Sequence, residues 1–279
     1  MRTCVAIFSL VAASGLVQAQ SFNLQADWSD AANPNGPWSF TQNGVPLPHV
    51  NAWQQQLGGW SQPQPAWALS QDATNRLPMF MRSNGSETFA HDWAAGNVVV
   101  HSTDGFNGQG DGTAVINFTL PFDATFNIHG GVWIGRDIGR SVDWNLVIGG
   151  STVTGGTVSS GDPYSSANPL PFASGFGGAG PLSGVAPAGT VIALTLPTHG
   201  GSPAGDFIVI DLTIDLQHTC IPDLNRDGVA DQGDVDYLIN VIAGGANPTG
   251  IDPDFNGDGV ADQGDIDGLI NAIAGAPCP

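Results

Sequence analysis

The stretch that decides the fold of the C-terminal part is DLNRDGVADQGDVDYLINVIAG, residues 223–244. A second copy, DFNGDGVADQGDIDGLINAIAG, occupies residues 254–275, at an offset of 31 residues and with 17 of 22 positions identical. Self-similarity at a fixed spacing indicates a duplicated structural unit. We therefore expect residues 219–279 to form one small domain built from two similar halves.

Each copy begins with a twelve-residue frame of oxygen donors. Calcium takes about six to eight oxygens, and a twelve-residue loop supplies them from its first, third, fifth, seventh, ninth and twelfth positions. Gly228 and Gly259 occupy the sixth position, where the chain turns sharply. The expected ligands of two Ca²⁺ ions are Asp223, Asn225, Asp227, the carbonyl of Val229, Asp231 and Asp234, and then Asp254, Asn256, Asp258, the carbonyl of Val260, Asp262 and Asp265. The alternative is a pair of solvated Asp-rich turns, which need not keep this frame twice.

A helix is expected after each loop, and none before it. Apolar residues recur at helical spacing at Val235, Leu238, Ile239 and Ile242, and again at Ile266, Leu269, Ile270 and Ile273. Gly244 and Gly275 then end the two helices. Two short helices bury little apolar surface, so we expect bound calcium to contribute to the folding of this domain.

Cysteine and the N-terminus both point to export. Residues 1–19 combine a charged start, a short apolar run and small residues before an expected cut after Ala19, as in a secretory signal. The run is too short to span a bilayer. In the mature chain Cys220 and Cys278 bracket the repeat and are expected to form a disulfide; free thiols or a metal pair are the alternatives. The protein is expected to be secreted or extracellular, either attached to the cell surface or released.

Charge excludes two classes of partner. The formal net charge is −19, the chain has no lysine, and the residues from Cys220 onward carry eleven aspartates and one arginine. A surface of this sign repels nucleic acid and anionic lipid. We therefore expect neither nucleic-acid binding nor membrane insertion.

Residues 20–218 are rich in Gly, Pro, Ser, Thr and Asn and show short alternating runs. The clearest run is 206–217, DFIVIDLTIDLQ, in which every second residue is apolar. Such strands separated by turn clusters predict an antiparallel β-sandwich. The expected fold is mainly β with a small α module, namely a jelly roll followed by the two-helix, two-calcium-loop domain. The Gly/Ser/Pro-rich stretch 151–187 is expected to be a surface loop.

The duplicated calcium loop with an exiting helix resembles a type I dockerin, a tandem half-EF-hand module that attaches secreted proteins to cohesin-bearing scaffolds. The bracketing cysteines resemble a variant seen in planctomycete-like secreted proteins. The resemblance covers about 60 residues and implies a cohesin-like protein partner and a near-twofold docking face. At the tenth and eleventh loop positions, which the family uses for partner choice, stand Gln232, Gly233, Gln263 and Gly264. Being identical in both halves, they would permit docking in two orientations, and they depart from the hydroxyl-rich pairs common in cellulosome dockerins.

The N-terminal part carries a weaker resemblance. Residues 33–39, NPNGPWS, and residues 205–214, which lead into the last strand, are similar to galactose-binding-like jelly-roll domains of secreted bacterial surface proteins. This resemblance implies a fold and no activity.

Residue patterns for catalysis are sparse, and no catalytic residue or organic cofactor is assigned. Glu87 is the lone glutamate, the aspartates at 137, 143, 206 and 211 are expected to point outward from strands or turns, and the histidines show no metal-ligand spacing. Trp53, Trp60 and Trp67 are expected mainly to pack, and the alternative is that one or two of their rings are exposed as a sugar platform. Trp133 and Trp144 are expected in the core.

The expected function is calcium-dependent docking that presents a sandwich of glycan-binding or structural role in an extracellular polysaccharide-related assembly. The rival is a polysaccharide-degrading enzyme, a glycoside hydrolase or lyase, with catalysis in the sandwich. A third hypothesis is that the C-terminal module serves only as a calcium-dependent stabiliser of the protein and has no partner.

Overall fold

The computed structural model describes residues 20–53, 59–70, 77–105, 112–219, 221–276 and 279. The expected signal segment, Cys220 and Cys278 lie outside these residues. The described residues fall into two compact units, one within Ala19–Gln217 and one within His218–Pro279.

The first unit is a sandwich of two sheets, which have nine and six strands over the described residues. Within each sheet, the neighbouring strands whose register is known are antiparallel. The nine-stranded sheet runs in the order β12-β9-β15-β7-β6-β5-β4, with β1 paired to β15 and β13 to β9. Its strands are β1 (Gln20–Asn23), β4 (His49–Trp53), β5 (Gln64–Ala68), β6 (Met79–Arg82), β7 (Val98–His101), β9 (Ala124–Ile134), β12 (Leu170–Pro171), β13 (Ser183–Ala186) and β15 (Phe207–His218).

The six-stranded sheet runs in the order β11-β10-β14-β8-β2-β3. Its strands are β2 (Trp38–Gln42), β3 (Val45–Pro46), β8 (Ala114–Thr119), β10 (Ser141–Ile148), β11 (Ser151–Ser159) and β14 (Val191–Leu196). Successive long strands cross between the sheets, with β8 in one, β9 in the other and β10 back in the first, as they do in jelly rolls.

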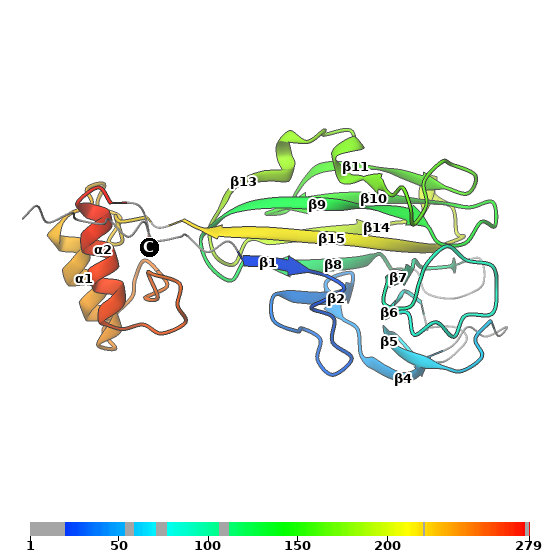
Figure 1. Cartoon of the computed structure of the whole chain (residues 1–279), viewed down its shortest axis with the longest axis horizontal. Helices are drawn as coiled ribbons and strands as arrows, with labels where there is room; N and C mark the ends of the chain where they lie inside the picture. Colours follow the sequence, from blue (N-terminus) through cyan, green and yellow to red (C-terminus); the bar gives the residue numbers. More distant parts are fainter. Residues whose placement is uncertain (1–19, 54–58, 71–76, 106–111, 220, 277–278) are drawn as a thin grey trace, which may run out of the picture. The chain divides into compact units, whose positions relative to one another are not determined.

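The alternation in the last strand explains how the sheets pack. In β15, yellow in Figure 1, Ile208, Ile210, Leu212, Ile214 and Leu216 all face the apolar core between the sheets. Apolar residues at every second position bury one face of a strand. The prediction of a sandwich from this pattern is confirmed.

The nine-stranded sheet also carries apolar residues on its outer face. Phe207 and Val209 point away from the main core into a second buried cluster, together with Met79, Met81 and Val99 of the neighbouring strands. The remaining buried members of that cluster are Val50, Trp53, Trp60, Ala66, Ala68, Leu77, Trp93 and Trp133. Part of this sheet is therefore buried on both faces, which strict alternation does not predict.

The stretch 151–187 is not a loop, so that expectation is wrong. It contains the nine-residue β11, the short strands β12 and β13, and 3₁₀ turns at Phe172–Ser174 and Gly180–Leu182; a third 3₁₀ turn lies further on at His199–Gly201. Gly155 and Gly156 lie within β11, where a Cβ would approach the backbone and ring of Trp144. The glycines thus permit close packing inside a strand rather than a flexible loop.

The second unit contains α1 (Gln232–Ile242) and α2 (Gln263–Ile273), which are its only helices over the part of the chain that is described. Its core is small, formed by Leu224, Val235, Leu238, Phe255 and Leu269. Each helix ends before a glycine with positive φ, Gly244 and Gly275, as the sequence predicts. Over the described residues, neither helix has the length and apolar character needed to cross a membrane.

Candidate functional site

The two twelve-residue loops have the same internal hydrogen bonds. In the first loop the Asp223 carboxylate accepts from the backbone amides of Asp227 at 3.1 Å and Gly228 at 3.0 Å. The second loop repeats these contacts, with Asp254 accepting from Asp258 at 3.1 Å and Gly259 at 2.8 Å. The first residue of each frame therefore closes the loop around its own side chain.

The glycine at the sixth position has positive φ in both loops, +96° at Gly228 and +92° at Gly259. An L side chain rarely adopts this backbone conformation. The seventh residue, Val229 or Val260, is exposed, at 59% and 58%. The sharp turn expected at the sixth position is present twice, and the valine side chains point to solvent.

The twelfth residue of each frame joins the loop to its helix. Asp234 is fully buried, and its carboxylate accepts from the amides of Asn225 at 2.9 Å and Asp231 at 2.8 Å. The Asp231 side chain also accepts from the amide of Gly233, and Asp231 and Asp234 each accept from the other's backbone amide in a capping box at the start of α1. In the second half Asp265 is likewise fully buried and bonds to Asn256 and Asp262.

The chemistry of the donors fits calcium, which binds carboxylate, amide and main-chain oxygens. The carboxylates in this structure bond mainly to backbone amides of their own loop. Over the described residues no group of three or more His, Cys, Asp or Glu side chains lies close enough to hold a metal ion. The structure thus gives the loop framework and the donor types but no assembled coordination sphere.

The glutamines of the expected docking face are exposed at the start of each helix. Gln232 donates to Asp236 at 3.0 Å, and Gln263 donates to Asp267 at the same distance. Two turns further along, Ile239 and Ile270 are exposed at 44% and 47%. The two halves therefore present matching polar and apolar groups.

The glycines of the same face pack closely on the loops. A Cβ at Gly233 would lie 3.2 Å from the Asn225 amide nitrogen, and one at Gly264 would lie 2.9 Å from that of Asn256. Larger residues at these positions would push against a side chain of the loop.

The tryptophans considered for a sugar platform are buried. Trp53, Trp60 and Trp67 are exposed by only 1%, 8% and 4%. Trp53 and Trp60 pack edge to face, with ring centroids 5.3 Å apart, inside the outer cluster. Trp53 and Trp60 cover the outer face of the nine-stranded sheet, and Trp67 lies in the core between the sheets. The favoured packing role is confirmed, and the alternative of an exposed platform is wrong. Trp133 and Trp144 are buried, as predicted.

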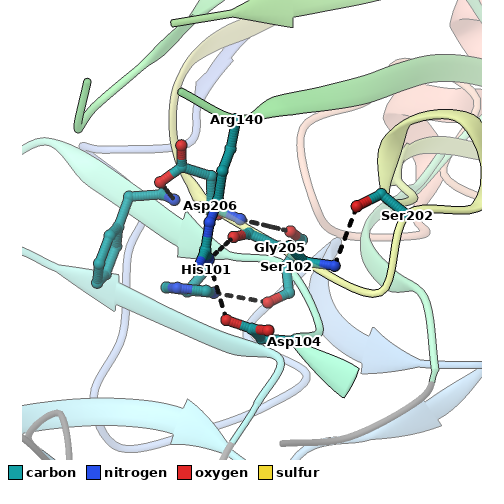
Figure 2. Close-up of polar contacts among 9 residues, drawn as sticks. His101, Ser102, Asp104, Arg140, Ser202, Gly205 and Asp206 are labelled. Atoms are coloured by element: carbon teal, nitrogen blue, oxygen red, sulfur yellow. Dashed lines mark hydrogen bonds and ion pairs between the residues drawn. The ribbon is translucent and has the colours of Figure 1, made fainter. Parts of the chain in front are cut away.

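A buried polar cluster lies where β7 and β15 meet the turn after β9 (Figure 2). Arg140 donates to the Asp104 carboxylate at 3.0 Å and to the carbonyl of Gly205. The Ser102 hydroxyl accepts from the amide of Asp206 at 3.2 Å. A Cβ at Gly205 would lie 2.1 Å from a backbone oxygen, so this close approach requires glycine.

Asp206 is the most perturbed group of this cluster. Burial raises the pKa of Asp206 from 3.8 to about 7, against the opposing effects of the Phe207 amide and of Arg140 and Arg136. One carboxylate oxygen accepts from Phe207 at 2.7 Å, and the other has no hydrogen-bond partner among the described residues. The expectation that Asp206 points outward is wrong.

The sequence held one signal for this cluster that the strand pattern did not use. Arg140 is one of six arginines in a chain without lysine. A rare cation between β-strands is a candidate for a buried ion pair. In addition, Gly205 and Asp206 directly precede four consecutive apolar residues at the start of β15. Alternation alone could not show that both faces of that start are covered.

The other acidic residues considered for catalysis are engaged in the sandwich. Glu87 is half-buried and accepts from Ser83 at 2.8 Å. Asp143 accepts from Thr157 at 2.6 Å and contacts the ring nitrogen of His199 at 2.7 Å. These contacts give both residues structural roles in holding neighbouring strands and turns.

No protein-family model matches this chain, and no curated protein matches it. Among solved structures, CBM51 from Clostridium perfringens GH95 in complex with methyl-galactose is 10% identical, covers 70% of this chain and 99% of its own, and has a TM-score of 0.28. CBM36 in complex with calcium and xylotriose is 12% identical, covers 45% and 87%, and has a TM-score of 0.21. The xylan-binding module CBM15 is 12% identical, covers 72% and 100%, and has a TM-score of 0.29. Because these TM-scores lie below 0.5, the likenesses carry no weight for the fold or function of this chain.

Proposed function

We propose that residues 219–279 bind two calcium ions and form a dockerin-like module that attaches the protein to a cohesin-like partner. The observation that carries this proposal is the duplicated scheme of loop hydrogen bonds, with a positive-φ glycine and a buried twelfth aspartate in each half. Solvated turns have no reason to repeat a closed twelve-residue frame and its capping box.

Calcium is the metal best matched to these loops. The donors are oxygens only, and each frame combines four aspartates, one asparagine and a main-chain carbonyl. Hard divalent cations prefer such a set, and a loop of this length suits the larger, more flexible sphere of calcium over that of magnesium. Bound calcium would neutralise part of the negative charge that the frame concentrates.

Titration of the calcium-stripped chain, residues 20–279, is expected to show two calcium ions bound per molecule in isothermal calorimetry. Asp223→Ala should leave one, and Asp223→Ala with Asp254→Ala should leave none, because each removes the first ligand of one frame. Asp236→Asn is the matched control, an exposed carboxylate on α1 outside both frames. Full binding by the double variant would sink the assignment.

The docking face follows from the same repeat. Gln232 and Gln263 occupy equivalent exposed positions with equivalent partners, and Ile239 and Ile270 add apolar contact area beside them. Interfaces of this kind need exposed apolar residues surrounded by polar ones. Matching halves would allow a partner to bind in either of two orientations.

A panel of purified type I cohesin domains tests the partner. We expect calcium-dependent binding that survives Gln232→Lys or Gln263→Lys alone, because the other half remains intact, and that is lost in the double variant. The control is Thr152→Lys, which adds the same charge at an exposed position of β11 in the sandwich and should leave binding unchanged. Binding that ignores calcium, or no binding to any cohesin, would contradict the proposal.

For the sandwich we propose a glycan-binding or structural role in an extracellular polysaccharide-related assembly, with the protein secreted or held at the cell surface. The support is the pairing of a rigid sandwich with a docking module. The rival, a polysaccharide-degrading enzyme, needs two carboxylates placed on either side of a glycosidic bond. Glu87 and Asp143 are engaged in structural hydrogen bonds, so these two acids give the rival no support.

A further inference from the structure

A pocket of about 350 Å³ opens on the sandwich, beside the end of β9. Three segments line it: residues 90–92, the turn that follows β9, and the turn that follows β11. Its polar lining includes His91, Asp92, Asp137, Ser160, Asp162 and Tyr164. The volume lies at the lower end of the range for small-molecule sites, which leaves room for about one or two sugar rings.

The walls of the pocket are held by hydrogen bonds between the three segments. Asp92 accepts from the backbone amide of Ser166 at 2.8 Å and from its hydroxyl, and its own amide donates to Gly135 at 2.8 Å. Asp162 accepts from the amides of Ser159 at 2.8 Å and Tyr164 at 3.0 Å. Both oxygens of these two carboxylates are thereby used, and the pocket is preorganised.

The third carboxylate is different. Asp137 is exposed at the pocket and has no hydrogen-bond or ion-pair partner in the described part of the chain. The pocket therefore offers a ligand one uncommitted carboxylate, held at a turn whose backbone is tied to Ser160.

Two further groups complement it. The Tyr164 ring packs against both apolar clusters of the sandwich, and its hydroxyl has no partner over the described ranges. The Nδ1 of His91 lies 2.8 Å from the Phe89 carbonyl, so it donates there and leaves Nε2 as an acceptor. The His91 ring also packs against Trp93, with ring centroids 4.4 Å apart and ring planes tilted by 42°.

We propose that this pocket binds a neutral saccharide unit. A carboxylate accepts from two neighbouring hydroxyls of a sugar, while a phenol and an imidazole can each exchange a hydrogen bond with a further one. This inference rests on the glycan-binding role proposed for the sandwich and gives it a site.

Other ligand classes fit less well. Three carboxylates on the lining disfavour phosphates, sulfates and uronic acids. A retaining or inverting glycosidase needs a pair of working carboxylates, whereas this pocket leaves only Asp137 uncommitted among its described lining.

The test is a titration of the chain from Gln20 to Pro279, in calcium buffer, with the methyl glycosides of glucose, galactose, mannose and xylose, followed by calorimetry or ligand NMR. At least one glycoside should bind. Asp137→Asn should weaken that binding about tenfold, and Tyr164→Phe about fivefold, by loss of a charged and a neutral hydrogen bond. Asp211→Asn, an uncommitted carboxylate on β15 outside the pocket, should change nothing.

The outcomes separate the site from the role. Retention of the wild-type chain on insoluble polysaccharides, with no glycoside binding or with binding indifferent to Asp137→Asn, overturns the pocket and leaves the glycan-binding role standing. If the wild-type chain is neither retained on polysaccharides nor binds a glycoside, the pocket and the glycan-binding role are both overturned. Displacement of the glycoside by calcium added above the buffer concentration, or by ethanolamine, would show a cation site instead and would also overturn the proposal. Asp137 is exposed, so the variant is expected to fold, and tryptophan fluorescence checks it.

Discussion

Chelation of calcium with EGTA is expected to unfold α1 and α2 and to leave the sandwich folded. Among the described residues of the module, five apolar side chains are buried in its core and six more are partly buried against them. Ligand binding stabilises a fold by about 2.7 kcal/mol per site when the free ligand is about 100-fold above its dissociation constant. Two such sites supply about 5 kcal/mol, which is comparable to the whole free energy of unfolding of a small domain. Removal of the calcium should therefore leave the module with little stability.

The chain provides separate reporters for its two units. All eight tryptophans lie before residue 145, within the sandwich, whereas both helices lie in the module. Hydrogen exchange measured by mass spectrometry should show complete loss of protection in peptides covering residues 232–243 and 263–274 after EGTA. Tryptophan fluorescence should not change.

The control is genetic removal of the same ligands. In calcium, the helix peptides of the double variant Asp223→Ala, Asp254→Ala should exchange as fast as those of the wild type do in EGTA. The helix peptides of Asp236→Asn should remain protected in calcium. Persistent protection of both helices in EGTA would show that the core and the expected Cys220–Cys278 bond suffice, and would refute a calcium-dependent fold.

The stability of the sandwich is expected to fall as the pH rises through neutrality. The pKa of Asp206 is about 7 in the folded chain, against a reference value of 3.8. Between these values the folded state keeps the proton that the unfolded state has lost, so stability decreases with rising pH and levels off above about pH 7. A difference of this size corresponds to about 4 kcal/mol in total.

Urea unfolding followed by tryptophan fluorescence, in calcium buffer between pH 5.5 and 8.5, measures this effect. Over that window most other carboxylates are already ionised. Asp206→Asn mimics the protonated group and should flatten the pH dependence, with higher stability than the wild type above pH 8. Asp211→Asn should keep the wild-type slope. Equal slopes in the wild type and Asp206→Asn would show that another group controls the pH response.

Local sequence patterns predicted well those parts of the fold that depend on neighbours along the chain. The alternation in 206–217 placed every second residue from Ile208 to Leu216 on one face, and the helical spacing after each loop placed Val235 and Leu238 in the small core. Gly244 and Gly275 marked the helix ends. In each case the signal lies within about one dozen residues.

Local patterns failed, or left alternatives open, where distant segments meet. Trp53 and Trp60 are buried because they cover the outer face of a sheet whose other strands come much later in the chain. Asp206 is buried because Arg140 and residues 101–104 close over it. The pocket needs Asp137, Tyr164 and His91 from three separate segments. No local periodicity encodes such meetings.

The strand β15 has a mechanical consequence. It begins beside the pocket, where the carbonyl of Phe207 accepts from Gly135 at 2.8 Å, and it ends at His218, where the module begins. Along its length it pairs with β7 through residues 207–210 and with β1 through residues 213–216, and β9 lies on its other side. Antiparallel hydrogen bonds run perpendicular to the strands, so a pull along β15 loads them in shear, all together. A protein held by its module and pulled through its ligand would thus carry the force along a strand that pairs with β1, β7 and β9.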